Sequence, residues 1–162
     1  MDKEEILEEI KKTKQHLTNM QNMLKECGYK RWKPKYDDRY YYVSEECTAT
    51  ENRAWAEYIV DERYRRYNVF KTEEEAKQEA EKILIRRQLE DIAKRLNKGE
   101  EIDWFDSEQP KHCIELFCNN IKTNFYFSHR TQGTTYCLDK NFLDVAKREI
   151  GEERLKAYLR SK

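Results

Sequence analysis

Two short stretches of the chain interleave cationic and aromatic side chains, a pattern that suits the binding of anions or of a partner surface. Guanidinium groups bind phosphate through paired N–H donors, and aromatic rings stack on bases. We predict that both stretches contact a ligand or partner; the alternative is that the rings pack on a sheet while the cationic ends reach solvent. The candidate residues are Lys30, Arg31, Trp32 and Lys33 in the first stretch, and Arg63, Tyr64, Arg65, Arg66 and Tyr67 in the second.

The histidines and cysteines do not form a pattern that predicts a metal site or a catalytic centre. His112, Cys113 and Cys118 invite a zinc hypothesis, but two strand residues five apart face opposite sides, whereas zinc needs converging ligands. No local signature pairs a thiol with a histidine that could act as its base. We therefore expect no metal, no cofactor and no catalytic residues, and we interpret the thiols as buried strand side chains.

Composition narrows the class of protein further. Lys and Arg together number 32, as do Asp and Glu, so the formal net charge is zero. A protein that coats nucleic acid normally has a basic excess. Charged residues make up 40% of the chain and apolar residues 38%, which predicts a thin core, while 12% aromatic residues argue against disorder. No apolar run is long enough to span a membrane, and the charged beginning of the sequence predicts no signal peptide. The chain has five cysteines, an odd number, at irregular spacings, which fits a reducing compartment.

In the sequence, these candidate residues follow a predicted N-terminal helix over residues 3–27. Its apolar residues alternate in steps of four and three, the heptad rhythm of a coiled coil. We predict that this seam pairs with a second copy, making the protein a homo-oligomer, or that it packs on the chain's own domain. Residues 1–28 would then be an oligomerisation helix, and residues 29–162 a single domain. The seam residues are Ile6, Ile10, Leu17, Met20 and Leu24.

The first half of that domain, residues 29–99, reads as two strands and a helix. Residues 39–43 and 55–60 are rich in strand formers and predict an antiparallel hairpin, with the polar residues 44–53 as its turn. The sequence from Thr72 to Glu75 is a capping box that predicts a helix start. This helix should continue to about Leu96.

The second half, residues 100–162, predicts three strands and a helix. The strands are expected at 113–118, 121–128 and 135–138, with Asn119-Asn120 as a hairpin turn. Asp139 is predicted to cap the following helix, and Gly151 to end it, before a last amphipathic turn. The predicted fold class is therefore α+β: a coiled-coil-like helix, then an antiparallel sheet with packed helices in the order ββα and βββα.

Several of these segments resemble small uncharacterised proteins encoded by phages and prophages of Gram-positive bacteria. In those proteins a short helix precedes an aromatic strand, a tryptophan, and an acidic helix start after a turn. The chain departs from the pattern at Tyr67, where glycine is usual. The matching segments are Arg31-Trp32-Lys33-Pro34, Tyr40-Tyr41-Tyr42-Val43, Trp55, the run from Asn68 to Ala76, and the ending from Ile150 to Leu159.

The resemblance implies an origin and, through it, a class of function. Small phage proteins without enzymatic motifs often act by occupying a host component, as anti-CRISPR proteins do. The expected function is a non-catalytic binding protein in the bacterial cytoplasm that interferes with host defence by occupying a host protein or nucleoprotein. The alternatives are a sponge that sequesters a nucleotide immune signal and a nucleic-acid-binding accessory protein.

Overall fold

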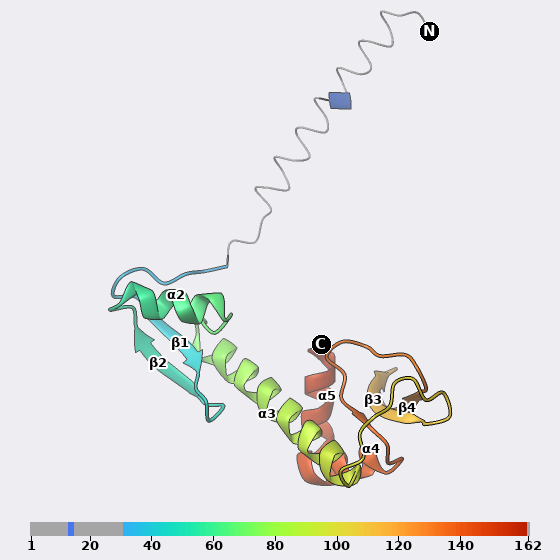
Figure 1. The fold of residues 1–162 in the computed structure, drawn as a ribbon. Coiled ribbons are helices and arrows are strands. Elements are labelled where there is room, and N and C mark those ends of the chain that lie inside the picture. Colours follow the sequence, from blue (N-terminus) through green and yellow to red (C-terminus); the bar gives the residue numbers. More distant parts are fainter. Residues whose placement is uncertain (1–12, 15–30, 162) are drawn as a thin grey trace, which may run out of the picture. The chain divides into compact units, whose positions relative to one another are not determined.

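The computed structural model describes residues 13–14 and 31–161 (Figure 1). The chain divides into two compact units, Met1–Lys33 and Pro34–Lys162. In the first unit, Thr13 and Lys14 are helical. The predicted seam lies outside the described residues, so oligomerisation through it stays a prediction; its residues are Ile6, Ile10, Leu17, Met20 and Leu24.

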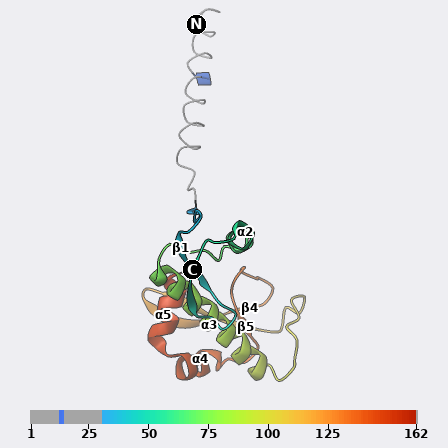
Figure 2. The same cartoon turned by 90° about the vertical axis from the view of Figure 1, so that its left-hand side faces the viewer.

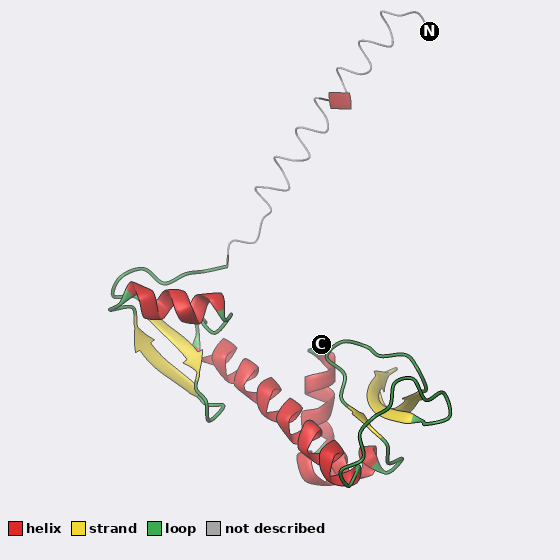
Figure 3. Ribbon diagram, viewed as in Figure 1, coloured by secondary structure: helices red, strands yellow, loops and turns green. Residues whose placement is uncertain are grey.

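The second unit is a mixed α+β structure, which confirms the predicted class (Figure 3). It begins with a two-stranded antiparallel sheet, β1 (Arg39–Val43) and β2 (Ala49–Arg53). The first strand was predicted correctly. The prediction of a second strand at 55–60 is wrong, because that region enters the helix α2 (Glu57–Arg65). Residues 44–53, predicted as a polar turn, contain the real second strand.

Helix α3 (Glu73–Leu96) begins at the predicted capping box. The hydroxyl of Thr72 accepts a hydrogen bond from the Glu75 amide at 3.2 Å, and the Glu75 carboxylate accepts one from the Thr72 amide at 3.2 Å. Two of the orphan N–H groups at the helix start are thereby satisfied. This helix contacts β1 and β2 as well as elements of the second half.

The second sheet has three antiparallel strands in the order β4-β3-β5: β3 (Lys111–Phe117), β4 (Asn120–Tyr126) and β5 (Tyr136–Cys137). All three predicted strands are confirmed, with shifted ends. The hairpin turn lies one residue earlier than predicted, at Cys118 and Asn119, whose φ angles are 46° and 66°. Two successive positive φ angles are what a two-residue hairpin turn requires.

Two helices follow β5: α4 (Phe142–Ile150) and α5 (Glu152–Arg160). Gly151, with φ 95°, ends the first of them as predicted. The prediction that Asp139 caps α4 is wrong, because Asn141 occupies the cap position. The carboxylate of Asp139 accepts a hydrogen bond from the Asn141 amide at 2.8 Å and so stabilises the turn before the helix. The predicted amphipathic last turn is the longer helix α5.

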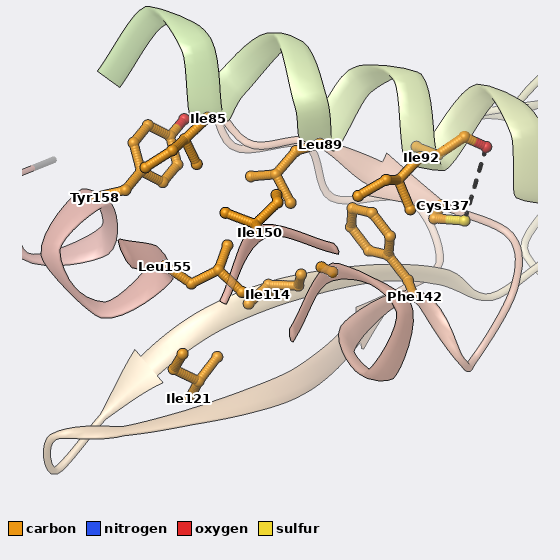
Figure 4. Close-up of a cluster of buried hydrophobic side chains, with 12 residues drawn as sticks. Ile85, Leu89, Ile92, Ile114, Ile121, Cys137, Phe142, Ile150, Leu155 and Tyr158 are labelled. Carbon is orange, nitrogen blue, oxygen red and sulfur yellow. Dashed lines mark hydrogen bonds between the residues drawn. The ribbon is translucent and has the colours of Figure 1, made fainter. Parts of the chain in front are cut away.

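The larger core lies where α3, α4, α5 and the second sheet meet (Figures 2 and 4). It draws apolar side chains from every one of these elements, and their burial supplies the main stabilising free energy of this part. Among the described residues, no helix is long and apolar enough to cross a membrane. The core residues are Ile85, Leu89, Ile92, Ala93, Ile114, Ile121, Cys137, Phe142, Ala146, Ile150, Leu155 and Tyr158.

Candidate partner-binding surface

The two predicted basic and aromatic stretches fall in different units of the chain. Lys30 lies outside the described residues. Arg31, Trp32 and Lys33 belong to the first unit, where Trp32 is half-buried and Lys33 exposed. The second stretch lies at the end of α2 in the second unit. The prediction that both stretches contact a ligand or partner stays a prediction.

Arg63 is engaged with the first sheet. Its guanidinium donates a hydrogen bond to the Tyr40 hydroxyl at 2.5 Å and lies 3.6 Å from the ring centroid of Tyr42. Tyr40 is fully buried. A cation held over a ring and bonded to a buried hydroxyl holds α2 on β1. The alternative interpretation placed the cationic ends in solvent, whereas the guanidinium of Arg63 lies on the sheet.

The other members of this stretch do not converge on one point. The Arg66 guanidinium pairs with the Glu62 carboxylate at 2.7 Å, one turn earlier on α2. Arg65 is exposed, and Tyr64 is half-buried. Tyr67 is 78% exposed and has a left-handed φ of 58°. The interleaved pattern in the sequence therefore becomes a set of side chains with separate surroundings.

The most prominent exposed aromatic group is the pair Tyr36 and Trp55. Their side chains are 77% and 61% exposed, and their rings meet edge to face with centroids 6.3 Å apart. Large apolar rings that stay in water while touching each other form a ready contact surface for a partner. Tyr58, 75% exposed, follows in the first turn of α2.

Hydrogen bonds fix the backbone of the two segments that carry Tyr36 and Trp55. The Asp37 amide donates to the Ala54 carbonyl at 3.2 Å, and the Ala54 amide donates to the Asp38 carbonyl at 3.0 Å. The Lys35 amide donates to the Asp38 carboxylate at 2.8 Å, which closes a tight turn around Tyr36. The residues before β1 and after β2 are thereby held side by side, and the two rings are positioned before any partner arrives.

Charged groups of both signs border the rings. The Arg53 guanidinium lies 5.9 Å from the Trp55 ring centroid and pairs with the Asp37 carboxylate at 3.1 Å. We call Tyr36, Arg53 and Trp55 the aromatic surface. It combines the three residue types that contribute most to binding energy in protein interfaces.

From the sequence, Trp55 was expected in a strand, and Tyr36 was not among the predicted binding residues. A usable signal is present nonetheless. Tyr36 lies three residues before β1 and Trp55 two residues after β2. Because antiparallel strands bring their outer flanks together, the correct hairpin would have predicted the contact.

A second polar cluster occupies the face of the second sheet that points away from the core. The Glu115 carboxylate accepts hydrogen bonds from Asn124 at 3.0 Å, from the Tyr126 hydroxyl at 2.9 Å, and from the Cys113 thiol at 3.6 Å. The Asn124 donor, together with those of Tyr126 and Cys113, holds the pKa of Glu115 below its usual range, although burial opposes the shift. The hydrogen bond to Glu115, with burial, raises the pKa of Tyr126.

This cluster brings a thiol and a carboxylate together, yet its members satisfy one another. Cys113 is fully buried, and its thiol is the donor in the contact with Glu115. The imidazole of His129 meets the Tyr126 ring at 5.7 Å between centroids. A nucleophile must reach its substrate and be activated by a base. A buried thiol that donates to a carboxylate instead stabilises the sheet.

The same face continues into a buried lysine. The Lys111 ammonium is fully buried and donates to the Asp106 carbonyl at 2.6 Å. Trp104 packs edge to face on Tyr136, with centroids 5.0 Å apart, and the Trp104 ring centroid lies 6.0 Å from the Lys111 ammonium and 5.5 Å from the Arg130 guanidinium. Two cations near one indole ring help to hold the loop before β3 and the loop before β5 against the sheet.

A polar cavity of about 480 Å³ lies where α3 ends and α4 approaches. His112 lines this cavity; its Nδ1 atom is buried without a hydrogen-bond partner, and burial lowers the pKa of this imidazole although Asp139 opposes the shift. The side-chain oxygen of Asn97 accepts from the Leu138 amide at 2.8 Å, which leaves the side-chain nitrogen of Asn97 as a donor. The lining residues are Leu96, Asn97, Lys98, Glu100, His112, Leu138, Asp139 and Lys140.

Among residues 13–14 and 31–161, no group of three or more His, Cys, Asp or Glu side chains could hold a metal ion. No protein family, no curated protein and no solved structure shows a significant match to this chain.

Proposed function

We propose that the chain is a non-catalytic binding protein that acts by occupying a partner protein through the aromatic surface. The observation that carries the proposal is the pair of exposed, mutually contacting rings of Tyr36 and Trp55 beside Arg53. The class of partner follows from the resemblance to phage and prophage proteins: a defence protein or nucleoprotein in the cytoplasm of a bacterial host.

The chemistry of the aromatic surface favours a protein partner over a phosphate backbone. Its cation is already paired, since Arg53 contacts Asp37, and neutralisation of phosphates would need unpaired cations. Its rings are held in place by backbone hydrogen bonds on both sides of the hairpin. Preorganised rings lose little conformational entropy when they bind, so more of their contact energy appears as affinity.

The polar clusters elsewhere in the described chain support the non-catalytic part of the proposal. The Glu115 carboxylate is occupied by three donors, and Lys111 is fully buried with its ammonium bonded to the backbone. Groups that perform acid–base or nucleophilic chemistry must reach a substrate. Occupancy without turnover needs only a stable surface.

The proposal is tested by phage plating on a Gram-positive host whose defence system restricts that phage. Expression of the wild-type chain should raise plating efficiency at least tenfold, and Trp55→Ala should abolish the increase. Phe105→Ala is the matched control, since Phe105 is a fully exposed aromatic residue outside the aromatic surface. Equal circular dichroism spectra show that the variants are folded.

The mode of action is tested with the purified target of that defence system. Titration should inhibit it stoichiometrically, with a fixed number of chains per target and no increase in inhibition over time. Inhibition at far lower ratios, growing with time, would instead identify an enzyme. Equal activity of Trp55→Ala and wild type would remove the aromatic surface from the function.

A second candidate function, sequestration of a nucleotide signal, is supported by the His112 cavity. Its volume suits a small ligand, and its potential donors include Asn97, Lys98 and Lys140. A nucleotide that binds should raise the melting temperature by mass action, and Lys98→Ala with Lys140→Ala should remove the increase. No increase with cyclic or linear nucleotides excludes this function. An affinity for nucleic acid that falls steeply with salt would instead support the accessory-protein alternative.

A further inference from the structure

The strand β4 (Asn120–Tyr126) forms one edge of the second sheet. It pairs with β3 along all seven of its residues, and the described part of the chain places no strand on its other side. It contains neither proline nor a bulge, and its only charged residue is Lys122. Proteins usually protect edge strands with prolines, bulges and charged side chains, because unpaired backbone groups recruit further strands. Of these features β4 has only the charge of Lys122.

The backbone of β4 presents hydrogen-bonding groups to this open side. The Phe125 amide donates to the side-chain oxygen of its neighbour Asn124 at 2.9 Å, which shows that it points away from β3. In an antiparallel ladder, residues that face the partner alternate with residues that face outward. The backbone N–H and C=O groups of Ile121 and Thr123 therefore point outward like those of Phe125, and the Asn124 side-chain oxygen takes the place of an acceptor on a further strand.

Two exposed aromatic side chains extend this edge. Phe125 and Phe127 are 53% and 42% exposed, and their rings pack edge to face with centroids 5.7 Å apart. Phe125 also contacts the imidazole of His112. Both phenylalanines lie on the same side, since their rings contact each other. An open edge and an apolar patch therefore coincide.

The strand is complementary to itself when two copies run antiparallel about a two-fold axis at Thr123. Ile121 then lies opposite Phe125 of the second copy, which pairs two apolar side chains. Lys122 lies opposite Asn124 of the second copy, so no like charges meet. The outward-facing residues of one copy also meet those of the other, as an antiparallel ladder requires.

We propose that two copies of the chain associate through β4, with Thr123 on the two-fold axis and the two three-stranded sheets joined into one. In the dimer the Phe125 amide donates to the Ile121 carbonyl of the second copy in place of Asn124. Lys122 of the second copy supplies a donor for the oxygen that Asn124 gives up. The contact is isologous, so it closes at two copies.

The test is the mass of the full chain in solution, measured by light scattering at micromolar concentration. The wild type should have twice the 19.9 kDa mass of one chain. If the N-terminal seam also associates, the wild-type mass is a higher multiple. In either case Thr123→Lys and Thr123→Glu should each halve it, because like charges would face each other across the axis. Thr123 is exposed, so neither change disturbs the core.

An equimolar mixture of the two Thr123 variants should restore the wild-type mass, since a lysine then faces a glutamate. Gln132→Lys, a change at an exposed loop position, is the matched control and should leave the mass unchanged. A wild type with the mass of one chain, an unchanged mass for Thr123→Lys, or a mixture that stays at the lower mass would each overturn the proposal. None of these outcomes depends on the aromatic surface, whose test uses Trp55.

Discussion

At the scale of single residues, Tyr67 shows how backbone conformation explains a sequence pattern. It follows α2 with φ 58°, in the left-handed region that favours glycine. Glycine, which the resemblance predicted at this position, adopts such a φ angle without steric strain. The side chain is 78% exposed, so burial does not offset the strain.

Tyr67→Gly should therefore stabilise the protein by about 0.5–1 kcal/mol, because relief of the left-handed strain exceeds the conformational entropy that glycine adds to the unfolded state. Tyr58→Gly is the matched control, an equally exposed tyrosine inside α2, and should destabilise by a similar amount. Urea unfolding measures both. Destabilisation by both changes would show that contacts of the Tyr67 side chain outweigh its backbone strain.

The contacts of the candidate binding residues were harder to predict than their positions in the sequence. The sequence shows which residues are cations and rings, but not which cation is already engaged. Arg63 and Arg65 are equivalent in the sequence, yet only Arg63 has a buried tyrosine hydroxyl within reach. Trp55 became a surface residue because the second strand ends at Arg53. The surroundings of Trp55 were therefore mispredicted because its element was mispredicted.

At the scale of elements, the start of α3 and the β3–β4 hairpin were predictable, because their signals are local. The strand β2 (Ala49–Arg53) was not, since its side chains are polar and half-exposed and its strand conformation comes from pairing with the tyrosines of β1. The apolar residues Ile59 and Val60 read equally well as strand or helix. In both segments, contacts with the rest of the fold, rather than local sequence, set the secondary structure.

The capping box of α3 carries a measurable share of stability. Thr72→Ala should destabilise the protein by about 1 kcal/mol, because it leaves the Glu75 amide without its hydrogen-bond acceptor. Thr72→Ser keeps the hydroxyl and should change the free energy of unfolding by less than half as much. Urea unfolding at neutral pH compares the three proteins. A serine variant as unstable as the alanine variant would show that the threonine methyl group, not the cap, is responsible.

At the scale of the whole molecule, α3 links the two sheets within the single compact unit Pro34–Lys162. It contacts β1 and β2, and it contributes Ile85, Leu89, Ile92 and Ala93 to the larger core. Because one helix takes part in both packing arrangements, loss of the larger core should expose the first sheet as well. The unit should therefore unfold in one cooperative transition.

This cooperativity can be followed with the chain's own tryptophans. Trp55 reports on the first sheet and Trp104 on the second, each made visible by replacing the other tryptophans with phenylalanine. Phe142 is the first residue of α4 and is buried in the larger core. Phe142→Ala should lower the free energy of unfolding by about 3–5 kcal/mol and shift the urea midpoints of both reporters equally. If only the Trp104 transition moved while that of Trp55 stayed in place, the two sheets would be separate folding units, and α3 would join them without coupling their stability.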